Sequence, residues 1–408
     1  MIKIGASRTD ITPDVGIWQA GFGGRDRPSE GVHIPLYTRA FAFSDGQRCA
    51  AVVTNDLVGL SRPEIIKIRK GAARQCEGLS ESDIMISCTH THSGPAVSSY
   101  LRGQPKDWDY IERLCLMISD TITEAYREMQ RGRLYFDATE VEGFNHNRRN
   151  EAGYREKRLA WLEAQDEQGQ FIGGLVNFTA HPTMLTGYML SGDYAGVLTQ
   201  QMERQLGGTV GMINGCHGNI NAYPRAREDY AVVDDHGARL AEQALRLRDA
   251  PEDVEAEQVA VRSRMVEVTF GPAQPRSVYE VIAADEDERD FVREWANDVL
   301  ATYPGDPVEG ADEGEVMAIQ LGRAVIIGIP GHAFAEIGRD IVAALPEKLV
   351  LIANHANDYL GYFGTREGHD EGGYEVEFAY RFNSSFRWAM DADTTYRMQD
   401  AAIELARK

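Results

Sequence analysis

The sequence has no apolar run long enough to cross a membrane and no secretory signal at its start. A membrane-spanning helix needs about 20 consecutive apolar residues. The first residues, Met1-Ile2-Lys3-Ile4-Gly5, also lack the basic region, apolar stretch and cleavage site of a signal peptide. We therefore expect a soluble protein of the cytoplasm.

Cysteine is scarce and is not arranged as a framework. The five cysteines are widely spaced, and none has a neighbour at the spacing of a zinc knuckle. Cys49 and Cys88 fall in strand-like runs, where reduced cysteines pack as small apolar residues. This pattern excludes a small disulfide scaffold and agrees with a reducing compartment.

Basic residues are too few to balance the acidic ones. Lysine and arginine number 42 against 63 aspartates and glutamates, which gives a formal net charge of −21. Nucleic acid and anionic membranes would repel such a chain, so we expect neither as a partner. The acidic runs 285–290 and 306–315 are typical of solvated surface. The expected partner is a small-molecule substrate, and a homo-oligomer remains open.

Internal repeats and low-complexity segments are also absent, and strands mostly alternate with helices. Residues 39–56 predict a hairpin of two strands around Ser44-Asp45-Gly46. Helical spacing predicts helices over 63–76, 109–130, 194–206, 232–247 and 391–408. The sequence thus predicts an α/β fold of mixed β-sheets with flanking helices. We expect one domain over 1–408, with a small helical cap inserted at about 255–315.

Two histidines follow an apolar run and come just before a glycine and a proline, which end regular secondary structure. The strand predicted over 84–88 leads into His90 and His92 and then into Ser93-Gly94-Pro95. Side chains at i and i+2 of an extended chain lie on one face, so both imidazoles can converge on one point. Imidazole is the commonest protein ligand for zinc.

Two further apolar runs end in the same way. The run 174–180 ends in His181-Pro182, and the run 323–329 leads into Pro330-Gly331-His332. Of ten histidines in the chain, four stand at such ends. Core histidines scattered at random would not share one position, so the pattern predicts a common metal site, with zinc as the expected ion.

The sequence resembles the neutral (non-lysosomal) ceramidase family along most of its length. The similar motifs are Gly5–Pro13, Gly31–Ala40, Val53–Leu57, Thr89-His90-Thr91-His92-Ser93-Gly94-Pro95, Asn147–Asn150, Ser191–Gly196, Ala356–Tyr362 and Gly372–Val376. The resemblance implies that His90, His181 and Tyr362 bind a catalytic zinc. It also implies that His92 and Arg148 line the pocket and polarise the scissile carbonyl. The additional immunoglobulin-like domain of the ceramidases has no counterpart before Lys408.

His332 departs from the family pattern. The fourth ligand implied by the resemblance is a glutamate in a Pro-Gly-Glu motif, and His332 takes its place. Histidine also binds zinc, so we expect His332 to be a ligand, and the site then becomes more positive by one charge. The alternative is that His332 has left the metal and that binding is weak or lost.

A second departure lies in the segment 215–221. The serine that the resemblance implies for ceramide hydrolysis corresponds to Asn221, and an amide cannot act as a hydroxyl nucleophile. His217 of the same segment either acts as general acid or base or hydrogen-bonds to the backbone. Asp193 either orients a metal-binding histidine or opens a helix, and Asp56 either lies near the histidines or caps a helix.

These residues predict a zinc-dependent hydrolase that cleaves an amide bond in a small soluble substrate through a metal-bound water. Ester, lactone or glycosidic-bond cleavage is the alternative chemistry, because a metal that polarises an oxygen does not choose the leaving group. A non-catalytic relative that binds a metabolite is the alternative of another class.

Overall fold

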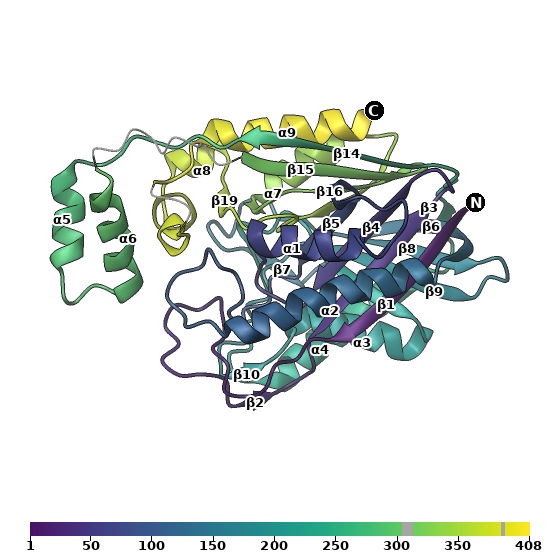
Figure 1. The fold of residues 1–408 in the computed structure, drawn as a ribbon, viewed down its shortest axis with the longest axis horizontal. Coiled ribbons are helices and arrows are strands. Elements are labelled where there is room, and N and C mark those ends of the chain that lie inside the picture. The colour runs from purple at the N-terminus through teal and green to yellow at the C-terminus, as the bar shows by residue number, and fades with distance from the viewer. Residues whose placement is uncertain (304–312, 385–387) are drawn as a thin grey trace.

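The computed structural model describes residues 1–303, 313–384 and 388–408, and it is built on two β-sheets (Figure 1). The large sheet has nine strands in the order β11-β9-β8-β6-β1-β3-β4-β5, with β13 paired to β6. Its strands are β1 (Ile2–Asp10), β3 (Tyr37–Ser44), β4 (Cys49–Asn55), β5 (Ile84–Cys88), β6 (Gln130–Glu140), β8 (Arg158–Asp166), β9 (Phe171–Phe178), β11 (Thr209–Asn214) and β13 (Glu252–Asp253).

The small sheet has four strands in the order β14-β15-β16-β18. They are β14 (Val259–Glu267), β15 (Glu313–Leu321), β16 (Ala324–Gly328) and β18 (Leu349–Ala353). Three short ladders pair β2 (Gly31–Val32) with β10 (Met189–Leu190), β7 (Asn145–Asn147) with β12 (Ile220–Ala222), and β17 (His332–Ala333) with β19 (Tyr362–Phe363).

Apolar residues on both faces of the strands make the two sheets pack against each other. On β16, Ile326 joins a core shared with Phe41 of β3, whereas Val325 and Ile327 face the opposite way into a second core. This alternation follows the two-residue period of a strand. The sheets therefore stack face to face, and each also buries an outer face under helices.

The helices form the outer layers. Helices α1 (Arg62–Ala73) and α2 (Trp108–Arg127) cover one half of the large sheet, and α3 (Asp193–Leu206) and α4 (Tyr230–Arg246) cover the other half. Helices α7 (Ala335–Ala343) and α9 (Ala392–Arg407) cover the small sheet. The order helix, sheet, sheet, helix confirms the predicted α/β class with mixed sheets and flanking helices. Within the described residues, no helix is both long and apolar enough to cross a membrane.

A helical hairpin stands away from the sheets. Its helices are α5 (Arg276–Ala284) and α6 (Asp290–Ala301), at the left of Figure 1. Of the range 255–315 expected to form a cap, the strand β14 pairs over its whole length with β15 and belongs to the small sheet. The helical part is thus confined to α5 and α6, and residues 304–312 lie outside the described residues.

Candidate metal centre

Five strands end in a segment that carries a histidine. The strands β5, β9, β11, β16 and β18 are followed by His90, His181, His217, His332 and His355. Strands β9 and β11 are parallel neighbours, and so are β16 and β18. Because the carboxyl ends of parallel strands lie at one edge of a sheet, this topology brings the histidines together.

Buried asparagines join four of the five ends, those of β5, β9, β11 and β18, across the two sheets. Asn214 Nδ2 donates to the carbonyls of Thr89 and Ala180, each at 2.9 Å. Asn177 Nδ2 donates to the carbonyls of Ile213 and Ile352, also at 2.9 Å. Buried and fully bonded amides of this kind fix the relative positions of the strand ends.

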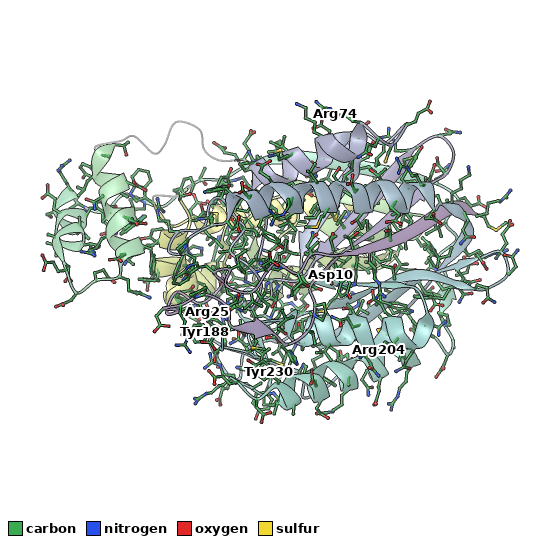
Figure 2. The ribbon with its side chains drawn as sticks, turned by 60° about the horizontal axis from the view of Figure 1, so that its bottom comes forward. Asp10, Arg25, Arg74, Tyr188, Arg204 and Tyr230 are labelled. Carbon is green, nitrogen blue, oxygen red and sulfur yellow. The ribbon has the colours of Figure 1, made fainter. Side chains whose placement is uncertain are left out.

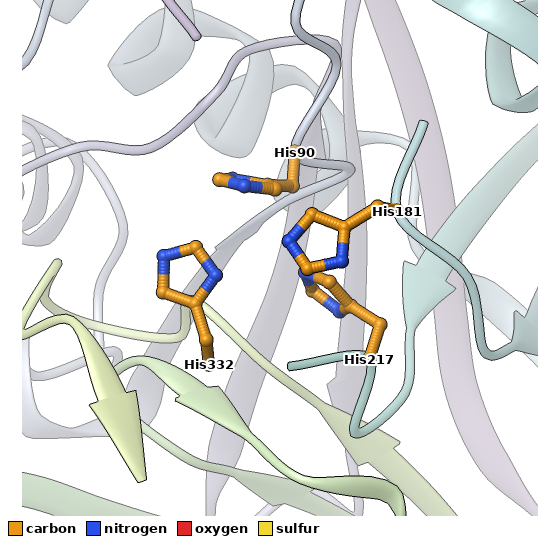
Figure 3. A group of neighbouring side chains, drawn as sticks. All are labelled: His90, His181, His217 and His332. Carbon is orange, nitrogen blue, oxygen red and sulfur yellow. The ribbon is translucent and has the colours of Figure 1, made fainter. Parts of the chain in front are cut away.

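Four of the histidines form one compact group. One ring nitrogen from each of His90, His181, His217 and His332 lies within 4.8 Å of the other three, and all four side chains are buried (Figure 3). In Figure 3, His90 enters from above, His181 and His217 from the right and His332 from the lower left, so the four rings surround a common centre. The structure therefore brings together all three histidines expected as ligands, and it adds His217.

Backbone carbonyls set the tautomer of three of these rings. The Nδ1–H groups donate to the carbonyl of Val58 from His90, to that of Ile220 from His181 at 3.0 Å, and to that of Gly215 from His217 at 2.8 Å. Each Nε2 then carries a lone pair, which is the form that binds a metal ion.

The remaining features of the group also fit a metal. The Nδ1 atom of His332 is buried without a hydrogen-bond partner, and one ring nitrogen of His332 points toward His181 and His217. Burial lowers the pKa of His90 to about 3 and that of His181 well below its usual value. Since the rings stay neutral, their lone pairs are available to a cation at neutral pH.

Tyr362 and Arg148 lie beside the histidine group. The Tyr362 hydroxyl is 3.4 Å from His181 Nε2 and accepts a hydrogen bond from Arg148 Nη2 at 3.0 Å. Arg148 also donates to Glu375 at 2.8 Å and to Asn221 Oδ1 at 3.4 Å. The predicted site residues Tyr362, Arg148 and Asn221 are thus connected through one half-buried guanidinium.

His92 lies at the pocket side of the group. Its Nε2 is 3.1 Å from Nε2 of His90, and because His90 uses its own proton on Val58, His92 is the donor. Arg25 holds this segment by donating to the carbonyls of His92 at 2.6 Å and Ala20 at 2.7 Å. Figure 2 shows Arg25 close to Tyr188, at the same end of the molecule as Tyr230.

A pocket opens onto the metal group from the side of the helical hairpin. His90, His92, His332 and Tyr362 are among its lining residues. Aromatic side chains and a few polar ones complete the wall: Phe22, Tyr359, Tyr374, Phe382, Ser98, Gln104, Lys106 and Asn383. An apolar wall with a few polar groups is the usual form of a site for a small molecule.

The structure decides between the open interpretations of two acidic residues. Asp193 opens α3, and its carboxylate accepts from the backbone N–H groups of Leu185 and Tyr194, so it does not orient a histidine. Asp56 does not cap α1, whose N-cap is Ser61, and its carboxylate accepts from Arg39 and from the backbone of Tyr37. The carbonyls that orient the histidines carry no sequence signal.

His355 was missed in the sequence. It follows the apolar run 349–353 as His90 follows 84–88, but the next glycine is Gly361, whereas Gly94 and Pro95 follow soon after His90 and mark the end of that strand. Its side chain is buried, and its ring stacks on that of His90 with 4.1 Å between centroids.

Comparison with known proteins points to one family. Residues 2–226 match the family model "Neutral/alkaline non-lysosomal ceramidase, N-terminal". The chain is 24% identical over 233 residues to neutral ceramidase of Pseudomonas aeruginosa, a match that covers 52% of this chain and 35% of that protein. It is 26% identical over 235 residues to neutral ceramidase B of Dictyostelium discoideum, covering 50% of this chain and 32% of that protein. The matched region is about a third of the length of these relatives.

The fold comparison covers the whole chain. The crystal structure of neutral ceramidase from Pseudomonas aeruginosa superposes with a TM-score of 0.80 at 19% identity, covering 100% of this chain and 74% of that chain. This likeness establishes the shared fold, and the family match covers more than half of the sequence. The chain belongs to the neutral/alkaline non-lysosomal ceramidase family.

Proposed function

We propose that the protein is a zinc-dependent hydrolase that cleaves an amide bond in a small soluble substrate. The observation that carries the proposal is the buried group of neutral histidines with their lone pairs turned inward, next to Tyr362 and Arg148. His90, His181, His332 and Tyr362 would hold the ion. A divalent metal bound there supplies Lewis acidity toward a carbonyl oxygen and lowers the pKa of water.

Arg148 positions and polarises the substrate carbonyl. Burial by itself lowers the pKa of Arg148, but Tyr362 and Glu375 together raise it, so the guanidinium stays charged. Its hydrogen bonds to Glu375, Asn221 and Tyr362 fix its plane before substrate arrives. A preorganised cation of this kind stabilises an oxyanion without reorganisation during the reaction.

His92 can move a proton at the pocket edge. Burial is the largest cause of the lowering of its pKa, so the ring is neutral, and its Nδ1 lacks a hydrogen-bond partner. The Nδ1 atom is therefore free to accept a proton from the attacking water or to interact with the leaving amine.

A small substrate is favoured over ceramide itself. Asn221 takes the place of the serine expected for ceramide hydrolysis, and its amide oxygen is engaged by Arg148. The net charge of −21 opposes approach to an anionic membrane. Short N-acyl compounds are the proposed substrates. Ester or lactone cleavage at the same site is the second candidate, because nothing in the metal group itself selects a nitrogen leaving group.

Assays of the zinc-loaded protein test this function. We expect turnover of at least one short N-acyl compound, and poor or no turnover of ceramide in detergent. Arg148→Ala should lower kcat/KM about 10²–10³-fold, the loss typical of one oxyanion donor, with the metal retained. Arg204→Ala serves as the control, because Arg204 is exposed on α3 and lines neither the pocket at the histidine group nor the cavity beside Arg148. Faster turnover of ceramide than of every soluble substrate would contradict the proposal.

A further inference from the structure

We propose that His217 and His355 hold a second transition-metal ion beside the one expected at His90, His181, His332 and Tyr362. The hydrolase proposed above needs only one ion, so this second position is independent of it. The proposal rests on His217 and His355, the two buried histidines that are not expected to bind the first ion.

The first observation concerns the burial and the backbone conformation of His355. Its side chain is only 1% exposed, and its backbone has φ of +51°, a region that non-glycine residues rarely adopt. His90, on which it stacks, also has a positive φ, of +69°. Such conformations are unfavourable for a residue with a side chain, and they cluster at functional sites, where the surrounding structure imposes them.

The second observation is the contact between the two rings. His217 Nε2 and His355 Nε2 lie 3.2 Å apart. His217 uses its Nδ1–H on the carbonyl of Gly215, so its Nε2 presents a lone pair to His355. Two imidazole nitrogens bound at about 2.0–2.1 Å to one tetrahedral metal ion lie roughly 3.3 Å apart. The pair therefore has the spacing of two ligands of one ion, and in the metal-free chain a single proton can occupy the same place.

The third observation is the number of donors. The first position already has four protein donors, and a zinc ion that expands to five-coordinate still takes up water or substrate there. His217 and His355 then remain buried beside that ion, and the Nδ1 atom of His355 has no hydrogen-bond partner. An ion between the two Nε2 atoms uses both lone pairs and replaces the shared proton.

The two positions are close enough to form one centre. The ring of His332 is 4.0 Å from that of His355 and 5.8 Å from that of His217, measured between centroids. Metal ions in two-metal sites lie about 3.5–4 Å apart. Among the described residues, the compact group contains only histidines and no carboxylate. Nitrogen donors select zinc, copper, nickel, cobalt or iron over magnesium and calcium.

Metal stoichiometry tests the proposal without an activity assay. The chelator-treated protein is titrated with Co²⁺, and binding is monitored by the visible absorption of the ion. The bound metal is then counted by elemental analysis. We expect two ions per chain in the wild type and one in His355→Asn and in His217→Ala. Asparagine tolerates the left-handed backbone at position 355 and can still hydrogen-bond to His217, so this variant keeps the fold.

His236→Ala is the matched control, because His236 is a buried histidine packed between Phe144 and Tyr194, outside the group. It should bind two ions. One ion in the wild type, or two ions retained in His355→Asn, would overturn the proposal. Either result would leave the hydrolase assay unaffected, so failure of the second position and failure of the proposed function are distinguishable.

Discussion

His332 stands where the resemblance implies a glutamate, and the structure places its free Nδ1 in the buried group. An imidazole and a carboxylate both bind zinc, but they differ by one charge. With histidine, an ion bound as proposed would keep a greater net positive charge beside Arg148. Such a charge supports the proposed preference for a polar or anionic substrate over a neutral lipid.

We expect His332→Glu to retain the metal and His332→Ala to weaken binding. Loss of a residue that merely supports a ligand costs about 10–100-fold in metal affinity, so loss of a ligand should cost at least as much. Competition with a fluorescent zinc chelator measures the affinity. Equal affinity in wild type and His332→Ala would remove His332 from the ligand set.

The sequence predicted as ligands the histidines that follow a long apolar run and have a glycine or proline close by. His90, His181 and His332 share that pattern, and the structure brings them together. His217 stands beside Gly218, and the sequence left its role open between a general acid or base and a loop histidine. The carbonyl of Gly215 that fixes its ring has no sequence signal. His355 was missed for lack of a flanking marker, and its stacking on His90 depends on the contact between two sheets, which no local pattern reports.

At the scale of elements, the hairpin α5–α6 supports the rim of the pocket. Phe291 of α6 stacks on Phe382 with 4.1 Å between centroids, and Phe382 lines the pocket. The segment 374–382 that carries Phe382 is a π-helix, η2 (Tyr374–Phe378), followed by a 3₁₀ turn, η3 (Ala379–Phe382). The hairpin therefore acts on the substrate side of the site and not on the metal.

Phe291→Ala should loosen this rim and leave the sheets intact. Truncation of a buried phenylalanine costs about 3–5 kcal/mol, and here the loss falls on the hairpin contact. Hydrogen exchange should show lower amide protection in 374–382, with KM raised and metal content unchanged. Val281→Ala, on α5 with 69% of the side chain exposed, should leave the protection as it is.

A buried ion network joins β3 to α3. Arg39 donates to Asp56 and to Glu203, each at 2.9 Å, and all three side chains are almost fully inaccessible. Removal of one member leaves an unpaired buried charge, which typically costs about 3–5 kcal/mol. Arg39→Met should lower the free energy of unfolding in urea by that amount.

The exposed pair Arg276–Glu280 provides the comparison for this variant. Arg276→Ala should change the free energy of unfolding by no more than about 0.5 kcal/mol. Similar losses in Arg39→Met and Arg276→Ala would show that the network adds nothing to stability.

The helices and strands could be predicted where the apolar residues follow a single period, either that of a helix or that of a strand. The strand predicted over 84–88 is β5, and the hairpin predicted over 39–56 is formed by β3 and β4. The small sheet could not be predicted as a separate layer, since β15 and β16 carry apolar residues on both faces and do not show which face meets which neighbour.

At the scale of the whole molecule, the buried histidines should make the metal-free chain sensitive to acid. Burial lowers the pKa of His90 to about 3 and that of the other five histidines of the site well below the usual value of 6.5. At a pH between the lowered pKa of such a histidine in the folded chain and its usual pKa in the unfolded chain, the unfolded chain binds more protons than the folded one. The free energy of unfolding therefore falls as pH falls, by up to about 1.4 kcal/mol per pH unit for each such group.

Four buried carboxyl groups act in the opposite direction. Burial raises the pKa of Asp193 and of Asp358 to about 6, and it also raises the pKa of Asp56 and of Glu64. In the folded state these groups bind protons earlier and add stability as pH falls. Six histidines outweigh four carboxyl groups. Urea unfolding in the presence of a chelator should thus give a lower free energy at pH 5 than at pH 7.5. A constant or rising value would contradict this prediction.

The carbonyls that hold the histidine rings belong to the main chain and not to side chains. A point mutation can delete an aspartate, but it cannot delete the carbonyl of Val58, Ile220 or Gly215. The orientation of these three rings therefore does not depend on which side chains stand at positions 58, 215 and 220. A substitution at His332, whose ring none of these carbonyls holds, would change one donor of the group and leave the other three in place.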